Sequence, residues 1–170
     1  SVARFARCIA IQWWHFKRRC LWHHFCLVFL LLARSKPRSE AEIKFNISQL
    51  DKNVYNFKLS NTVGDELLFG YNHTSKTFYV DRRNSGDTEF SSKFAHRVST
   101  APRTSSNTHL SGTLLIDKTS IEIFYDDGET VMTEIFFPNA PFENLSLSSE
   151  NGEFILDHLE AYELDIRDAN

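Results

Sequence analysis

The chain has 170 residues, of which 42% are hydrophobic and 14% aromatic, which suits one globular domain of about 100 to 150 residues plus a further segment. Its charge is unevenly distributed: residues 1–38 contain eight basic and no acidic side chains, and the remainder has 11 basic against 22 acidic. Because a strongly acidic domain repels phosphate backbones, this composition excludes nucleic acid as a partner of the larger part.

The basic segment, residues 1–38, differs in kind from the rest, since it contains every Cys and every Trp of the chain. Its apolar run, residues 25–33, has nine residues, whereas a helix that crosses a bilayer needs about 20. Basic residues before this run give residues 17–33 a weak likeness to a secretory signal. We therefore expect residues 1–38 to stand outside the fold, as a signal, a disordered tail or out-of-frame sequence.

No metal site and no cofactor site are expected. Cys20 and Cys26 lie near His23 and His24, but their spacing matches none of the usual paired-ligand patterns of zinc sites. The remaining candidates are scattered over separate segments without a repeated ligand spacing: His73, His96, His109 and His158.

From residue 39 onward, hydrophobic residues alternate with polar ones, as in half-buried β-strands. This pattern predicts about nine strands, over residues 43–47, 55–59, 66–70, 77–81, 110–117, 119–125, 130–137, 144–148 and 153–166. No convincing helical periodicity separates them. The predicted fold of residues 39–170 is therefore all-β: a two-sheet antiparallel β-sandwich of the concanavalin A-like or jelly-roll type.

Turn residues separate the predicted strands. Asp127-Gly128 between two apolar runs indicates a hairpin, because a tight turn needs positive φ and Gly adopts it at little cost. Asp126 and Asp127 are both expected to be solvated there. Pro138 ends a strand, since Pro cannot donate to a ladder, and residues 99–109 are expected to form the longest polar loop.

Three ordered segments carry a family likeness: residues 78–86 read FYVDRRNSG, Ala101-Pro102 follows, and residues 114–138 read LLIDKTSIEIFYDDGETVMTEIFFP. Together they resemble the C-terminal β-sandwich module of family 32 glycoside hydrolases, the invertase, levanase and inulinase group. Lys118 and Thr119 stand where Arg and Ser are commoner in the family, and Asp126 where Asn is common. The resemblance covers residues 40–166 and implies the sandwich fold.

The resemblance implies that a five-bladed β-propeller precedes this module in family members and carries all three catalytic carboxylates. The family's Trp-Met-Asn-Asp-Pro-Asn, Arg-Asp-Pro and Glu-Cys motifs do not occur in this sequence; Arg167-Asp168 is followed by Ala169. No catalytic residue is therefore assigned, and the chain alone is not expected to be an enzyme. Its implied role is to pack on and stabilise a catalytic propeller of a fructan- or sucrose-cleaving enzyme, secreted or periplasmic.

The expected propeller interface consists of Glu122, Phe124, Phe136 and Phe137. Phe124 and Phe136 each fall on the strand face opposite their strand's β-branched residues, so one of the two faces must bury against something other than the sandwich core. Glu122 is read as partly buried and paired near this interface. An apolar face without its partner domain also predicts self-association.

A different class of function stays open: a lectin-like module that binds a fructan oligosaccharide directly. Sugar platforms present exposed aromatic rings, and residues 39–170 contain no Trp. Tyrosines would have to serve: Tyr55, Tyr71, Tyr79, Tyr125 and Tyr162. Acceptor patterns for N-glycosylation begin at Asn46, Asn72 and Asn144.

Overall fold

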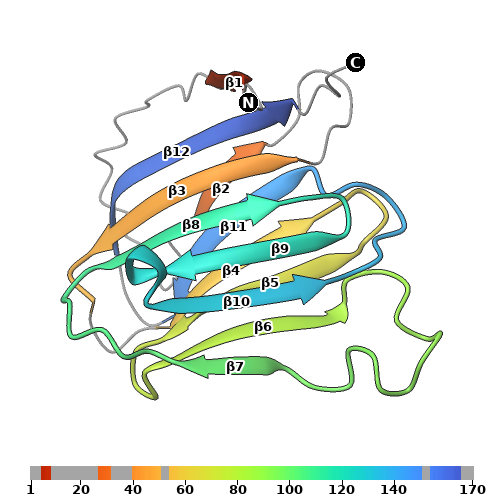
Figure 1. Ribbon diagram of the computed structural model, residues 1–170, viewed down its shortest axis with the longest axis horizontal. Helices are drawn as coiled ribbons and strands as arrows, with labels where there is room; N and C mark the ends of the chain where they lie inside the picture. Colours follow the sequence, from red (N-terminus) through yellow and green to blue (C-terminus); the bar gives the residue numbers. More distant parts are fainter. Residues whose placement is uncertain (1–4, 9–26, 32–39, 51–53, 151–153, 166–170) are drawn as a thin grey trace.

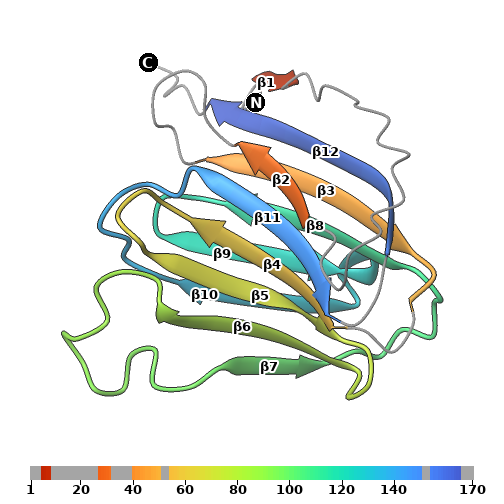
Figure 2. The same cartoon turned by 180° about the vertical axis from the view of Figure 1, so that it is seen from behind.

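The computed structural model describes residues 5–8, 27–31, 40–50, 54–150 and 154–165, and these form two antiparallel six-stranded sheets packed face to face (Figures 1 and 2). The two-sheet antiparallel β-sandwich predicted from the alternation is confirmed. In the described part of the chain, no helix is both long and apolar enough to cross a membrane.

The first sheet contains, in spatial order, β1 (Phe5–Cys8), β12 (Ile155–Asp165), β3 (Ala41–Ser48), β8 (Leu110–Ile116), β9 (Ser120–Tyr125) and β10 (Thr130–Ile135). The second contains β2 (Leu27–Leu31), β11 (Asn144–Glu150), β4 (Val54–Ser60), β5 (Glu66–Asn72), β6 (Thr77–Asn84) and β7 (Ser99–Pro102). A single turn of 3₁₀-helix, η1 (Asp126–Gly128), joins β9 to β10.

The core lies between the sheets and is built by alternate residues of each strand. In β4, for example, Tyr55, Phe57 and Leu59 are almost fully buried. Aromatic rings dominate the contact: Phe57 stacks on Phe69 at 5.2 Å between centroids, and Phe78 on Tyr125 of the opposite sheet at 3.9 Å. Each such pair contributes about 0.5–1.5 kcal/mol beyond its buried area.

Three details differ from the sequence prediction. The polar stretch 99–109 begins with a strand, β7, which pairs with β6. The predicted hairpin between β9 and β10 is confirmed, but its turn is η1, and positive φ extends over Asp126 (49°), Asp127 (58°) and Gly128 (90°). Strand β10 ends at Ile135, two residues before the predicted end.

Phe136 does lie opposite Val131 and Ile135, but its nomination for the propeller interface is wrong. Val131 and Ile135 point to solvent, each 49% exposed, while Met132 and Phe136 are buried. Val131 and Ile135 thus lie on the outer face of this edge strand, and Met132 and Phe136 fill space between the sheets. Phe136 therefore shares the core with Phe142, at 5.4 Å between ring centroids.

Two short strands lie within residues 1–38. β1 pairs antiparallel with β12, and β2 with β11, so each occupies the outer edge of one sheet. Among the residues whose burial the structure describes, the core residues belong to β3–β12 and the loops between them. The domain boundary at residue 38 stays a prediction, and Cys20, His23, His24 and Cys26 lie outside the described residues.

Deleting residues 1–38 is expected to leave the thermal midpoint nearly unchanged, because β1 and β2 are edge strands, each paired with a single neighbour. The measurement is calorimetry of the full chain beside two truncations, one lacking residues 1–26 and one lacking residues 1–38. A drop of about 4 °C or more, worth roughly 1 kcal/mol in a domain of this size, would contradict the boundary. A drop confined to the longer truncation would assign the loss to the segment that contains β2.

Candidate functional site

The residues nominated from the sequence do not form one surface. Glu122 and Phe124 both lie on the outer face of β9, where Glu122 is exposed rather than partly buried and Phe124 is half-buried. Phe136 is 0% exposed and offers no ring surface to a partner. Phe137 is 40% exposed at the far end of β10. The structure therefore separates Phe124 from Phe137 and removes Phe136 from the set.

Phe137 belongs to an aromatic cluster that the sequence reading did not find. Its ring lies 5.5 Å from that of Phe90 and 5.6 Å from that of Phe94, and those two are 4.7 Å apart. Phe90 is 58% exposed, although it packs against both other rings. We call Phe90, Phe94 and Phe137 the aromatic cluster. The loop between β6 and β7 supplies two of its members, a contact that strand periodicity could not reveal.

Arg82 holds the aromatic cluster against the sandwich. Its guanidinium carbon lies 4.3 Å from the centre of the Phe94 ring, a cation–π geometry. Its Nη1 donates to the Ile135 carbonyl at 2.8 Å, and its Nε lies 3.3 Å from a Glu134 carboxylate oxygen. Since Arg82 belongs to β6 and Glu134 to β10, this arginine also joins the two sheets.

The backbone around Gly86 packs closely against the backbone of Phe137, next to the aromatic cluster. Gly86 has a φ of +121°, and a Cβ at this position would lie 2.1 Å from the Phe137 carbonyl oxygen. Only glycine adopts this positive φ readily and has no Cβ to collide with the carbonyl. The close approach lets the Asp87 amide donate a hydrogen bond to the same Phe137 oxygen at 2.8 Å. The loop that carries Phe90 and Phe94 is thereby tied to the Phe137 backbone.

Asp65 fixes the chain just after Phe137. It accepts hydrogen bonds from the Asn139 amide (2.6 Å), from Asn139 Nδ2 (3.0 Å) and from Asn61 Nδ2 (2.8 Å). Burial alone would raise the pKa of the Asp65 carboxyl, but these hydrogen bonds outweigh it and the pKa is lowered. Asp65 is therefore a charged structural anchor rather than a proton donor.

A second feature is a groove of about 520 Å³ on the outer face of the first sheet. Outward side chains of β3, β8, β9 and β12 line it, and η1 closes one side. We call it the outer groove; its lining includes Lys44, Asn46, Ser111, Thr113, Phe124, Asp127, Gly128 and His158.

Cross-strand pairing places these side chains in two rows. Lys44 pairs with Thr113, which in turn pairs with Phe124. Asn46 pairs with Ser111 on one side and with His158 on the other. Directly opposite residues on one face of an antiparallel pair lie about 4.5–5.5 Å apart, so each row presents its polar groups in close succession.

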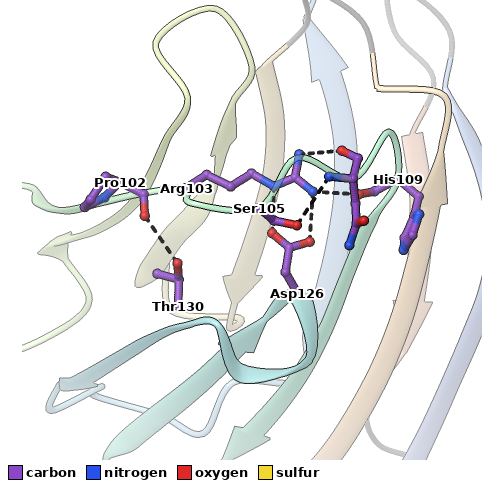
Figure 3. A network of polar contacts seen from close by, with 7 residues as sticks. Pro102, Arg103, Ser105, His109, Asp126 and Thr130 are labelled. Carbon is purple, nitrogen blue, oxygen red and sulfur yellow. Dashed lines mark hydrogen bonds and ion pairs between the residues drawn. The ribbon is translucent and has the colours of Figure 1, made fainter.

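The wall formed by η1 depends on a buried ion pair (Figure 3). Arg103 donates from Nε and Nη2 to the two carboxylate oxygens of Asp126 at 2.6 and 2.9 Å, and the two side chains are 3% and 1% exposed. Arg103 also donates to the carbonyls of Asn107 and His109. The expectation that both turn aspartates are solvated is thus wrong for Asp126 and holds for the exposed Asp127.

Burial alone would lower the pKa of Arg103, but its hydrogen bonds to Asp126 outweigh this effect and the pKa is raised. The guanidinium stays charged, and both Asp126 oxygens are occupied by it. A carboxylate held in this way is a fixed acceptor and is not available as a nucleophile or as an acid.

The tyrosines expected to serve as a sugar platform are mostly structural. Tyr55, Tyr71 and Tyr125 are at most 1% exposed. Tyr79 is half-buried and its hydroxyl bonds Asn56. The half-buried ring that lines the outer groove is instead Phe124. Among the described residues, no three His, Cys, Asp or Glu side chains lie close enough to hold a metal ion.

Comparison with known proteins adds sequence relatives. A family model described as glycosyl hydrolases family 32 C terminal matches residues 29–163. A levanase of Bacillus subtilis (strain 168) is 28% identical over 123 residues, which are 72% of this chain and 18% of that protein. A levanase of Bacillus sp. (strain L7) is 30% identical over 110 residues, covering 65% of this chain and 12% of that protein. The chain thus spans under a fifth of these curated relatives.

Solved structures show the same fold. The exo-inulinase from Aspergillus awamori aligns with a TM-score of 0.67 at 22% identity, over 88% of this chain and 30% of that one. A fructofuranosidase from Schwanniomyces occidentalis, complexed with fructose, aligns with a TM-score of 0.61 at 19% identity, over 82% of this chain and 31% of that one.

Replacing Arg103 by Met is expected to lower the free energy of unfolding by about 3–5 kcal/mol, because Asp126 would remain buried without its counter-charge. The double change Arg103→Met with Asp126→Leu should recover at least half of that loss. Urea denaturation measures both. The matched control is Arg83→Met: Arg83 pairs with Asp81 at 2.7 Å but is exposed, so its loss should change stability little. Equal losses for the two arginines would contradict the role given to burial.

Proposed function

The chain belongs to the family of glycosyl hydrolases family 32 C-terminal domains, and we propose that it is the non-catalytic module of a fructan- or sucrose-cleaving glycoside hydrolase, similar to the levanases and β-fructofuranosidases. In this role it packs on a catalytic β-propeller domain and stabilises it. The relatives are several times longer than this chain, which supports a larger parent enzyme. An Aspergillus awamori relative is named an extracellular exo-inulinase, which supports a parent that acts outside the cytoplasm.

A non-catalytic role agrees with the placement of the carboxylates. A retaining glycosidase needs two carboxyl groups about 5–5.5 Å apart, one of them with a raised pKa. Asp126 is committed to Arg103, and Asp127 and Glu122 are exposed on the outer side of the first sheet. The family's catalytic motifs are also absent from the sequence.

The observation that carries the packing role is the aromatic cluster. Phe90 and Phe137 are 58% and 40% exposed, and Ile135 beside them is 49% exposed. Contiguous exposed apolar surface on a soluble domain marks an interaction site. We therefore assign the contact with the catalytic domain to this end of the sandwich. Interfaces between domains of one chain typically cover about 600–1,500 Å², so the cluster would form the apolar centre of a wider polar contact.

The cluster is also prepared for contact before any partner arrives. Arg82 stacks on Phe94, and Gly86 lets the loop backbone meet the Phe137 carbonyl. A surface that is already ordered loses little conformational entropy on association. This favours a lasting packing role over a transient contact.

The purified chain is expected to hydrolyse neither sucrose, levan nor inulin, because its sequence lacks the family's nucleophile and acid/base motifs. Release of reducing sugar is the measurement, with a family levanase as positive control. Turnover that persists through purification and disappears in Glu122→Gln or Asp127→Asn would show that the module is itself an enzyme.

The isolated chain should self-associate and bind a hydrophobic dye through the aromatic cluster. Phe90→Ser combined with Phe137→Ser should reduce both signals several-fold, whereas Val131→Ser, an equally exposed apolar residue at the other end of β10, should not. Co-expression of a levanase propeller lacking its own C-terminal module should suppress both signals. Sedimentation velocity and dye fluorescence measure the outcome. A chain that is monomeric and dye-silent at high concentration would remove the main support for packing.

A further inference from the structure

We propose that the outer groove is a binding site for a neutral oligosaccharide, centred on Phe124 and separate from the surface that meets the catalytic domain. The proposal goes beyond the packing role, since a module that only packs on a propeller needs no second binding surface. It rests on the shape of the groove, its polar groups and its charge.

The size of the groove suits a small ligand. Its volume of about 520 Å³ lies within the range of roughly 300–1,000 Å³ that is typical of ligand sites. The floor of the groove is the first sheet, whose hydrogen-bonded strands fix the positions of the lining side chains. The turn η1 forms one wall, and the buried ion pair between Asp126 and Arg103 holds this turn in place. The site is therefore formed without a ligand.

The lining matches a polyhydroxylated molecule. Asn46 and Thr113 can both donate and accept hydrogen bonds, as sugar hydroxyls do. The half-buried Phe124 ring adds apolar surface for the C–H face of a pyranose or furanose ring.

Charge selects a neutral ligand over an anionic one. The Lys44 ammonium lies 3.3 Å from Glu42, and His158 lies 3.4 Å from Glu160. Asp127 adds a negative charge at the η1 wall. A phosphate or carboxylate would meet these acidic groups without a free cationic cluster to bind it, whereas a neutral sugar would not be repelled.

The two surfaces can be used at the same time. The outer groove is bounded by η1, which precedes β10, whereas the aromatic cluster contains Phe137, which follows β10, and two residues of the loop between β6 and β7. Figure 1 shows η1 and this loop at opposite ends of β10. Six residues of extended strand span about 17 Å. The module can thus contact a catalytic domain at one end while a glycan occupies the other.

The test is a titration of the full chain, produced in a bacterial host, followed by NMR chemical shifts. The probes are an inulin-type trisaccharide, a levan-type trisaccharide and, as an anionic comparison, inorganic phosphate. We expect at least one trisaccharide to shift resonances of Asn46 and Thr113, and phosphate to shift neither. Phe124→Ala should weaken binding by roughly tenfold, the upper end of what the loss of one ring contact costs.

Two further variants make the test decisive. Thr113→Val keeps the side-chain volume and removes only the hydroxyl, so it reports on the groove even if Phe124→Ala does not fold; it should weaken binding several-fold. Phe90→Ala removes an exposed ring outside the groove and should bind sugar like the parent chain. The proposal is overturned if neither trisaccharide binds, if Thr113→Val binds unchanged, or if Phe90→Ala loses as much affinity as Phe124→Ala. None of these outcomes would affect the packing role, which is tested through Phe90 and Phe137.

Discussion

The buried pair of Arg103 and Asp126 closes one corner of the sandwich, and several other features depend on it. Arg103 follows β7 in the second sheet, while Asp126 follows β9 in the first, so their contact joins two elements that no ladder connects. The same guanidinium holds the carbonyls of Asn107 and His109, which orders the return of the chain into β8. A buried ion pair adds little net stability compared with apolar side chains, but it penalises every arrangement that separates the charges. In this protein the ion pair therefore favours a single geometry for η1 and for the loop between β7 and β8.

Arg82 also connects the two sheets, at the other end of the edge that is formed by β7 and β10. It reaches from β6 to Glu134 of β10 and covers the ring of Phe94. The edge formed by β7 and β10 is therefore closed by one arginine at each end, with the Thr130 hydroxyl bonded to the Pro102 carbonyl between them. Each arginine supports a different surface: Arg103 the outer groove and Arg82 the aromatic cluster. Both candidate sites thus depend on contacts made at this edge, although the outer groove itself lies over β3, β8, β9 and β12.

Local pattern was sufficient for the fold but not for the sites. Alternation identified the buried rings of β4 because this strand is covered on one face only, and turn chemistry identified the bend at Asp127. Alternation did not predict which residues are buried around β10, an edge strand: Val131 is exposed, and Phe136, just after the strand, is buried. Burial at this edge depends on contacts with the opposite sheet. The partner of Asp126 could not be inferred either, since Arg103 is 23 residues away. The aromatic cluster likewise depends on how a long loop folds back, which no periodicity encodes.

Asn46 combines two of the observations made above: it lines the outer groove, and it begins an Asn-Ile-Ser acceptor triplet. Its side chain faces outward from β3 and is partly accessible. In a host that N-glycosylates proteins, a glycan attached to the side-chain nitrogen of Asn46 would begin inside the outer groove. It would then compete with any free sugar as a tethered ligand at high effective concentration. If the groove binds sugar as proposed, the apparent affinity of the module would therefore depend on whether the expression host glycosylates Asn46.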